Sequence, residues 1–319
     1  MNTFDQAATT TFEPPTTLDA SSLDAPSLDA PSLDAPSLDT PSPAVDPTIS
    51  ILGVEVTNTT ERQAIDLIEA MIRHDDGRPR SLFFVNAHTL NLAAADRRYR
   101  DVLNTADHVF ADGTGVRWAA RLQGVRMQDN VNGTDLTPEL FRSTAGRGYS
   151  YFLLGATEAT IGRAARYASQ TFTGWTLVGS HHGYLDHPEL TTEVIRQINE
   201  ARPDVLLVGM GNPLQERWIR RHRHRLDVPV CLAVGGLFTY WAGELRRSPR
   251  WLRRCGWEWL GILLQQPHKA RRYLLGNPRF LIRALCDAWK ARRRRRLYSN
   301  TRTTPADRWH TVSTHPAGF

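Results

Sequence analysis

The sequence predicts an α/β fold, in which helices flank a mostly parallel sheet and a basic helical appendage follows. Three observations lead to this prediction. Between residues 49 and 245, short apolar stretches alternate with longer amphipathic ones. Several apolar stretches end in glycine or a carboxylate, as parallel strands often do before the next helix. Basic residues gather after Leu245, whereas the part between residues 49 and 245 is close to neutral.

Length and composition limit the number of domains and indicate the cellular compartment. A chain of 319 residues has room for one large domain or two small ones with a sizeable core. The three cysteines, Cys231, Cys255 and Cys286, show no spacing typical of disulfides or metal sites. The N-terminus lacks the charged and then apolar stretch of a signal peptide. We therefore expect a cytoplasmic protein in a reducing compartment.

Both ends of the chain differ in composition from the part between them. Residues 1–48 hold eight acidic residues and no lysine or arginine, and they repeat Ser-Leu-Asp-Ala-Pro from Ser22 to about Pro41. Such frequent proline forbids a helix, and one leucine per repeat cannot build a core. We expect a disordered acidic tail, for which a dispensable extension is favoured over a repulsive bristle or a docking strip for the basic segment. Residues 297–319 are expected to form a second disordered tail.

The elements of the body, residues 49–245, follow from hydrophobic periodicity. Apolar residues recur at helical spacing in Thr60–Arg73, whereas Ser81–Asn86 is mostly apolar, as expected for a strand buried on both faces. Strands are expected at Ile49–Val56, Ser81–Asn86, a run ending at Asp112, Tyr149–Leu154, Trp175–Gly179, Asp204–Val208 and Val230–Val234. Helices are expected at Thr60–Arg73, His88–Asn104, just after Asp112, and at Thr137–Ala145, Glu158–Phe172, Pro188–Ala201 and Leu214–Leu226. Repeated alternation with short connections predicts a Rossmann-like sheet covered by helices.

The stretch from Val109 to Val116 reads Val-Phe-Ala-Asp-Gly-Thr-Gly-Val, an apolar run that ends in a carboxylate before a helix. In an open α/β sheet, ligands bind beyond the carboxyl ends of the strands, where this turn is expected to lie. Asp112 is therefore placed as a catalytic or ligand-holding carboxylate, with Gly113 beside it. The alternative is that Asp112 only caps the following helix.

Three further strand ends carry glycine, and they are expected along the same edge of the sheet. They read Gly155-Ala-Thr157, Gly209-Met-Gly211-Asn212 and Gly235-Gly236. Glycine lets the backbone approach a phosphate or a sugar, and helix N-termini supply amide donors. Together with Asp112, these turns predict a cleft of nucleotide size.

The sequence lacks the motifs of several classes of nucleotide-binding protein. Gly209-x-Gly211 is followed by Leu214 where a dinucleotide fingerprint needs its third glycine. The chain has no Walker lysine and no Asp-x-Asp pair, and its histidines lack the spacing of metal ligands. We expect no cofactor and no metal held by the protein.

The stretch from Pro203 to Ile219, Pro-Asp-Val-Leu-Leu-Val-Gly-Met-Gly-Asn-Pro-Leu-Gln-Glu-Arg-Trp-Ile, closely resembles the hallmark of the WecG/TagA/CpsF glycosyltransferases, glycosyltransferase family 26. Further matching motifs occur in the family's order, at Phe83–His88, Ala111–Val116, Asn132–Leu136, Gly183-Tyr184, Val234–Phe238, Ala242–Trp251, Trp257–Leu260 and Pro267–Leu274. The resemblance covers roughly Ile49 to Leu285 and leaves only the tails outside.

The resemblance implies an enzyme that moves a sugar from a nucleotide donor, usually UDP-linked, onto a sugar carried by undecaprenyl diphosphate. Such enzymes work at the inner face of the bacterial membrane, with inversion at the anomeric carbon and without a metal. Asp112 matches the family's presumed general base, and Arg247, Arg271 and Arg272 match arginines thought to close over the donor diphosphate. The other candidate substrate-binding residues are Asn86, Gly113, Asn132, Asp135, Gly155, Tyr184, Gly211, Asn212, Gln215, Glu216, Gly235 and Gly236.

Some positions depart from the family pattern. Phe84 stands where members of the teichoic-acid type carry threonine, and Asp129–Asn132 stands where they carry an arginine. Gly261-Ile262 replaces the Tyr-Arg of many members. These differences argue against an N-acetylmannosamine donor and favour the capsule and exopolysaccharide branch.

The appendage, Arg246 to Arg296, carries sixteen lysines and arginines against Glu258 and Asp287, and tryptophans lie among them. Basic residues with interfacial aromatics suit an anionic membrane surface, and some of the arginines are expected to complete the active site. The run Arg292–Arg296 suits nucleic acid as well, but no nucleic-acid motif accompanies it. The rival to an enzyme is a non-catalytic regulator that binds a nucleotide sugar. The oligomeric state is left open, a homo-oligomer included.

Overall fold

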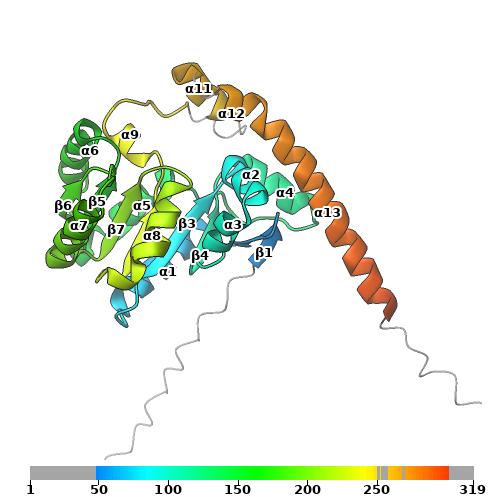
Figure 1. Cartoon of the computed structure of the whole chain (residues 1–319), viewed down its shortest axis with the longest axis horizontal. Helices are drawn as coiled ribbons and strands as arrows, with labels where there is room; N and C mark the ends of the chain where they lie inside the picture. Colours follow the sequence, from blue (N-terminus) through cyan, green and yellow to red (C-terminus); the bar gives the residue numbers. More distant parts are fainter. Residues whose placement is uncertain (1–47, 250–251, 253–257, 268–269, 302–319) are drawn as a thin grey trace, which may run out of the picture. The chain divides into compact units, whose positions relative to one another are not determined.

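The computed structural model describes residues 48–249, 252, 258–267 and 270–301 (Figure 1). Residues 1–47 of the expected acidic tail therefore lie outside the described residues, as do residues 302–319 of the expected C-terminal tail; Thr48 is the first residue of β1. None of the described helices is both long enough and apolar enough to cross a membrane.

The centre of the structure is an eight-stranded sheet with the order β1-β2-β4-β3-β8-β7-β5-β6. The strands are β1 Thr48–Ile51, β2 Val54–Thr57, β3 Arg80–Val85, β4 His108–Ala111, β5 Ser150–Gly155, β6 Thr176–His181, β7 Val205–Gly209 and β8 Val230–Ala233. Only the edge pair β1 and β2 is antiparallel; every other described pair is parallel. The predicted Rossmann-like, mostly parallel sheet flanked by helices is confirmed.

Twelve α-helices are described. They are α1 Glu61–Arg73, α2 Ala87–Ala95, α3 Arg97–Leu103, α4 Thr114–Leu122, α5 Gly133–Ser143, α6 Glu158–Thr171, α7 Pro188–Ala201, α8 Leu214–His222, α9 Leu237–Trp241, α11 Glu258–Gln265, α12 Ala270–Leu274 and α13 Gly276–Thr301. Most body helices start where the sequence predicts, because capping residues mark the starts. Thr60 caps α1 in a capping box with Gln63, and Thr157 caps α6.

Two expected elements are each divided in the structure. The single strand expected at Ile49–Val56 is the hairpin of β1 and β2, because Leu52 (φ 53°) and Gly53 (φ 81°) adopt left-handed backbone and reverse the chain. The single helix expected at His88–Asn104 is interrupted at Asp96. There the backbone is extended, and the carboxylate accepts from the Tyr99 amide to cap α3.

Two helix bounds also differ from expectation. Helix α5 begins at Gly133, before the expected start at Thr137, because the Asn132 side chain accepts from the Asp135 amide and caps the helix. Helix α8 ends at His222 and continues only as a short 3₁₀ turn over residues 223–225.

The hydrophobic core lies on both faces of the sheet. Within β3, Phe83 belongs to one apolar cluster and Phe84 to the other, since successive side chains of a strand point to opposite faces. Helices α2, α3, α4, α7, α8 and α13 contribute to the first cluster, and α1, α5, α6 and α9 to the second. As expected, β3 is covered on both sides.

Helix α13, drawn in orange to red in Figure 1, packs on α2 and α4. Its inner face buries Phe280, Ala284 and Ala288. Asp287 accepts hydrogen bonds from the Leu52 amide (2.9 Å) and from the side chain of Gln123 (3.2 Å). The helix runs to Thr301, past the boundary expected for the appendage at Arg296.

The Asp287 contacts predict a measurable contribution to stability. In Asp287→Ala, the Leu52 amide and the Gln123 amide lose a charged acceptor in a partly buried place. We expect the free energy of unfolding to fall by about 1–3 kcal/mol, as measured by urea denaturation. Asp227→Ala, a change at an exposed carboxylate before β8, is the control and should change it by less than about 0.5 kcal/mol. Equal stability of the two variants would show that Asp287 does not secure α13.

Candidate functional site

The carboxylate of Asp112 lies directly beyond β4, at the carboxyl edge of the sheet. Strands β3 and β4 are parallel, with Val85 opposite Ala111, so the residues that follow them meet. The Asp112 amide donates to the Val85 carbonyl (2.9 Å), and the Asn86 Nδ2 donates to Asp112 Oδ2 (3.2 Å). The Asn86 Oδ1 in turn caps α2, which fixes the direction of the Asn86 side chain.

The turn after Asp112 decides between the two interpretations of this residue. The N-cap of α4 is Gly113, and no side chain caps that helix. Gly113 has φ 97°, which glycine adopts without strain, and its amide donates to the Asn130 side chain. Asp112 is therefore not a helix cap, and its carboxylate is held beside Asn86 instead.

The pKa of Asp112 is raised above the usual aspartate value, chiefly by burial. The hydrogen bond from Asn86 and the charges of Arg247 and Arg272 oppose this shift, whereas the charge of Asp135 adds to it. A carboxylate with a raised pKa is a stronger base, which is the property that general base catalysis requires.

A second group of predicted residues surrounds Arg247. Its guanidinium pairs with the Asp135 carboxylate and lies over the Tyr240 ring, 5.3 Å from the centroid. The other carboxylate oxygen of Asp135 accepts from Asn132 Nδ2 (2.9 Å). The structure thus brings Asn132, Asp135 and Arg247 together on the side of the site formed by α5.

Helix α12 supplies the other predicted arginines. Arg272 is half-buried, and its charge influences both Asp112 and His88. Arg271 lies on the exposed side of the helix. His88, in the first turn of α2, has a pKa lowered to about 4 by burial and then by Arg272, so its imidazole is neutral at pH 7.

The glycine turns of β5, β7 and β8 lie at the same edge. Gly155 pairs with Gly209, and a Cβ on Gly155 would come within 2.4 Å of the Gly209 carbonyl oxygen, so glycine is needed there for strand packing. Gly211 and Gly235 have positive φ and open space around the Cβ position. Gly236 precedes α9 as its N-cap.

The hallmark residues lie beneath these turns. Gln215 and Glu216 are 1% and 0% exposed, and the Asn212 side chain donates to the Glu216 carboxylate. Tyr184 is 60% exposed, in the loop after β6. Gly183, next to it, is packed against the Gly155 backbone.

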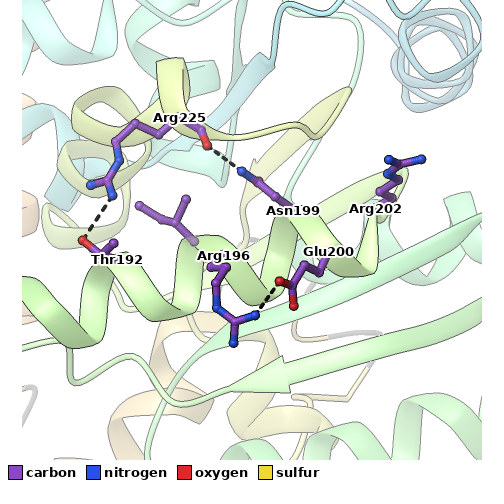
Figure 2. A pocket seen from close by; sticks show the side chains of 7 residues that line it. Thr192, Arg196, Asn199, Glu200, Arg202 and Arg225 are labelled. Atoms are coloured by element: carbon purple, nitrogen blue, oxygen red, sulfur yellow. Dashed lines mark hydrogen bonds and ion pairs between the residues drawn. The ribbon is translucent and has the colours of Figure 1, made fainter.

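A hollow beside α7 is separate from this site (Figure 2). Figure 2 shows Arg225 joined to Thr192 and Asn199, and Arg196 joined to Glu200. Two residues that line the hollow are Arg202, which precedes β7, and Arg225, which precedes β8. The hollow therefore lies at the amino ends of these strands. Because Asp112 follows the carboxyl end of β4, the hollow is at the opposite edge.

Across the described part of the chain, no three His, Cys, Asp or Glu side chains are grouped so that they could hold a metal ion.

Sequence reasoning did not select three residues that shape the site. His88 belongs to the family motif Phe83–His88, two positions after Asn86, and this position in the motif could have identified it. Asn130 holds the Gly113 turn, and Tyr99 donates to Glu216 Oε2 (3.2 Å). Asn130 lies in the stretch Asp129–Asn132 that departs from the family pattern, but the sequence does not show its contact with Gly113, 17 positions away. Tyr99 has no signal in the sequence, because Glu216 lies 117 positions along the chain.

Comparison of the sequence with known proteins identifies the family of this chain. The model of the WecG/TagA/CpsF glycosyltransferase family matches residues 49–295. The chain belongs to this family. An N-acetylglucosaminyldiphosphoundecaprenol N-acetyl-β-D-mannosaminyltransferase of Staphylococcus aureus strain MRSA252 is 32% identical over 212 residues, 66% of this chain and 82% of the relative. Proteins of the same name from strains NCTC 8325 and COL match with the same identity and coverage.

Membership of the WecG/TagA/CpsF family makes the chain a glycosyltransferase, which confirms the predicted enzyme class over the non-catalytic regulator. The capsule and exopolysaccharide branch stays a prediction, because these relatives are named mannosaminyltransferases. The structure places Phe84, one of the departing positions, in the core, where its ring would lie 3.1 Å from a Cβ on Gly133.

Proposed function

We propose that this glycosyltransferase moves a hexosyl or N-acetylhexosaminyl group from a UDP donor to a sugar on a polyprenyl diphosphate. The transfer inverts the anomeric carbon, uses no protein-held metal and builds a bacterial surface polysaccharide of the capsule or exopolysaccharide type. The relatives' names support a lipid-linked acceptor. The observation that carries the proposal is the Asp112 carboxylate, held by Asn86 and close enough to Arg247 and Arg272 for their charges to act on it.

The proposed reaction uses the site in one displacement. Asp112 accepts the proton of the acceptor hydroxyl while the hydroxyl oxygen attacks the anomeric carbon. The bond from that carbon to the donor diphosphate breaks, and UDP leaves with the electron pair. Arg247 and Arg272 are the cations available to balance the charge that develops on the leaving diphosphate. Asn86 keeps the carboxylate aimed at the acceptor.

A second part of the proposal is that the enzyme attaches peripherally to the inner face of the cell membrane. Support comes from the outer face of α13, opposite the face that packs on the body. Ile282 and Trp289 are 63% and 61% exposed there, and Arg293 lies over the Trp289 ring at 5.6 Å. Exposed apolar and aromatic side chains beside basic ones suit an anionic lipid surface.

Asp112→Asn tests the chemistry. The amide still accepts from Asn86, so the fold should persist, but it cannot take a proton. We expect kcat to fall by about 10²–10⁴-fold in transfer of labelled sugar from a UDP donor to a polyprenyl-diphosphate-linked acceptor. In the wild type, activity should be lost as pH falls through the raised pKa of Asp112, because only the ionised form is a base. Asp227→Asn is the matched control, and near-normal turnover of Asp112→Asn would remove Asp112 from the mechanism.

Chelation tests the role of metal. We expect turnover to survive excess EDTA, because in the proposed site the arginines, rather than a metal ion, offset the charge of the diphosphate. The measurement is the initial transfer rate before and after dialysis against the chelator. Complete loss that magnesium or manganese restores would contradict metal independence.

Substitution on α13 tests membrane attachment more cleanly than removal of the appendage, because removal would uncover the surface that Phe280, Ala284 and Ala288 cover. Ile282→Ser with Trp289→Ser should lower co-flotation with vesicles of phosphatidylglycerol several-fold. High salt should release the wild type only partly, because the apolar contact is not screened. Tyr167→Ser, at an exposed aromatic on α6, is the control. Unchanged flotation of the double variant would refute attachment through this face.

A further inference from the structure

The side chain of Gln215 joins two of the glycine turns from below. Its Oε1 accepts from the Gly211 amide (3.1 Å) and from the Gly235 amide (3.1 Å). Its Nε2 donates to the Ala233 carbonyl (3.2 Å) and to Glu216 Oε1 (2.8 Å). One side chain thus fixes the end of β7 to the end of β8.

These four bonds fill the hydrogen-bonding capacity of a glutamine side chain, which has two acceptor lone pairs and two donor hydrogens. Gln215 is also 1% exposed. A donor substrate could reach its amide only if one of the four bonds broke and the turns moved apart. The geometry therefore does not suit direct contact with a ligand.

Glu216 closes the network on the other side. Its Oε1 also accepts from the Asn212 side chain, and its Oε2 accepts from the hydroxyl of Tyr99. Tyr99 comes from α3 and is 0% exposed, as is Glu216. Asn212 extends from the same turn as Gly211, so the carboxylate holds that turn at a second point.

We propose that Tyr99, Gln215 and Glu216 are positioning residues that form a buried clamp, which sets the turns of Gly211 and Gly235 for donor binding without touching the donor. This inference rests on the proposed use of a nucleotide-sugar donor. It changes the expected role of Gln215 and Glu216 from contact with substrate to support of the turns that make the contact.

The physical reason is preorganisation. A turn that is already held in its bound conformation does not lose conformational entropy when the donor arrives. Gly211 and Gly235 gain the most from such support, because glycine has the widest conformational freedom. Since the turns are expected to hold the donor equally before and during reaction, loosening them should raise KM more than it lowers kcat.

Burial raises the pKa of Glu216 to about 7, against the opposing hydrogen bonds from Gln215, Tyr99 and Asn212. Glu216→Gln therefore separates hydrogen bonding from charge. The new Oε1 can still accept from Asn212 and Gln215, and the new Nε2 can donate to the Tyr99 hydroxyl oxygen. A clamp that works by hydrogen bonding should survive this substitution.

The experiment combines amide hydrogen exchange with steady-state kinetics on the full chain. In the wild type, the Gly211 and Gly235 amides should exchange slowly, because both donate to Gln215. Gln215→Met keeps the side-chain length but makes none of the four bonds. We expect loss of protection at both glycines and a donor KM raised about tenfold or more, with kcat within about threefold.

Two further variants complete the test. Glu216→Gln should keep the slow exchange of the Gly211 and Gly235 amides from pH 6 to 8, because it retains the hydrogen bonds to Gln215 and Asn212. Tyr99→Phe should raise KM, whereas Tyr151→Phe should not. Tyr151 is the matched control, because it is equally buried and its hydroxyl has no hydrogen-bond partner among the described residues.

Other results would overturn the clamp. Fast exchange of both glycine amides in the wild type would do so without any activity measurement, so a misfolded variant cannot hide a failure. A collapse of kcat in Gln215→Met at unchanged KM would place Gln215 in the chemical step. If the wild type transfers no sugar from any nucleotide donor, the proposed function fails, and the exchange data still decide whether the clamp exists.

Discussion

The parallel register of β3 and β4 is the constraint on which the site depends. Because Val85 lies opposite Ala111, the next residue of each strand lies at the same edge, and Asn86 meets Asp112 there. The Asn86 side chain and the Asp112 backbone are both held in place. Asn86 is committed to the N-terminus of α2, and the Asp112 backbone is bonded to Val85. The sheet itself therefore aims the carboxylate.

The appendage brings two positive charges near Asp112. Arg247 and Arg272 both lie after the body, and their charges act on Asp112. Helix α12 leads into α13, which is anchored on the body by Phe280 beside Gly115. Gly115 is the second residue of α4, three positions after Asp112, so the helix that follows the arginines packs close to the carboxylate that they influence. Packing of α13 on the body and the placement of these arginines near Asp112 thus involve the same part of the fold.

Local features were predictable from the sequence, and long-range ones were not. Apolar runs ending in glycine or carboxylate located the strands, and caps such as Thr157 marked helix starts. The reversal at Leu52 and Gly53 was missed, because a single glycine within an apolar run is a weak turn signal and leucine rarely adopts left-handed backbone. The buried carboxylate of Glu216 accepts a hydrogen bond from Tyr99, which is 117 positions away. The family motif marks Gln215 and Glu216 as functional candidates. Only the fold shows that their hydrogen-bonding groups are used by partners inside the protein.

Burial raises the pKa of Asp112, and the hydrogen bond from Asn86 and the charges of Arg247 and Arg272 oppose that shift. The proposed function requires the same two arginines to pair with a diphosphate as well. A guanidinium that pairs with an incoming diphosphate offers less stabilisation to a nearby carboxylate, because the anion screens its charge. Arrival of the donor would therefore move the Asp112 pKa further upward and strengthen the base. Before the donor arrives, Asp135 already pairs with Arg247 and keeps part of that charge away from Asp112. In the proposed mechanism, the same few charges would link donor binding to proton removal through the arginine side chains.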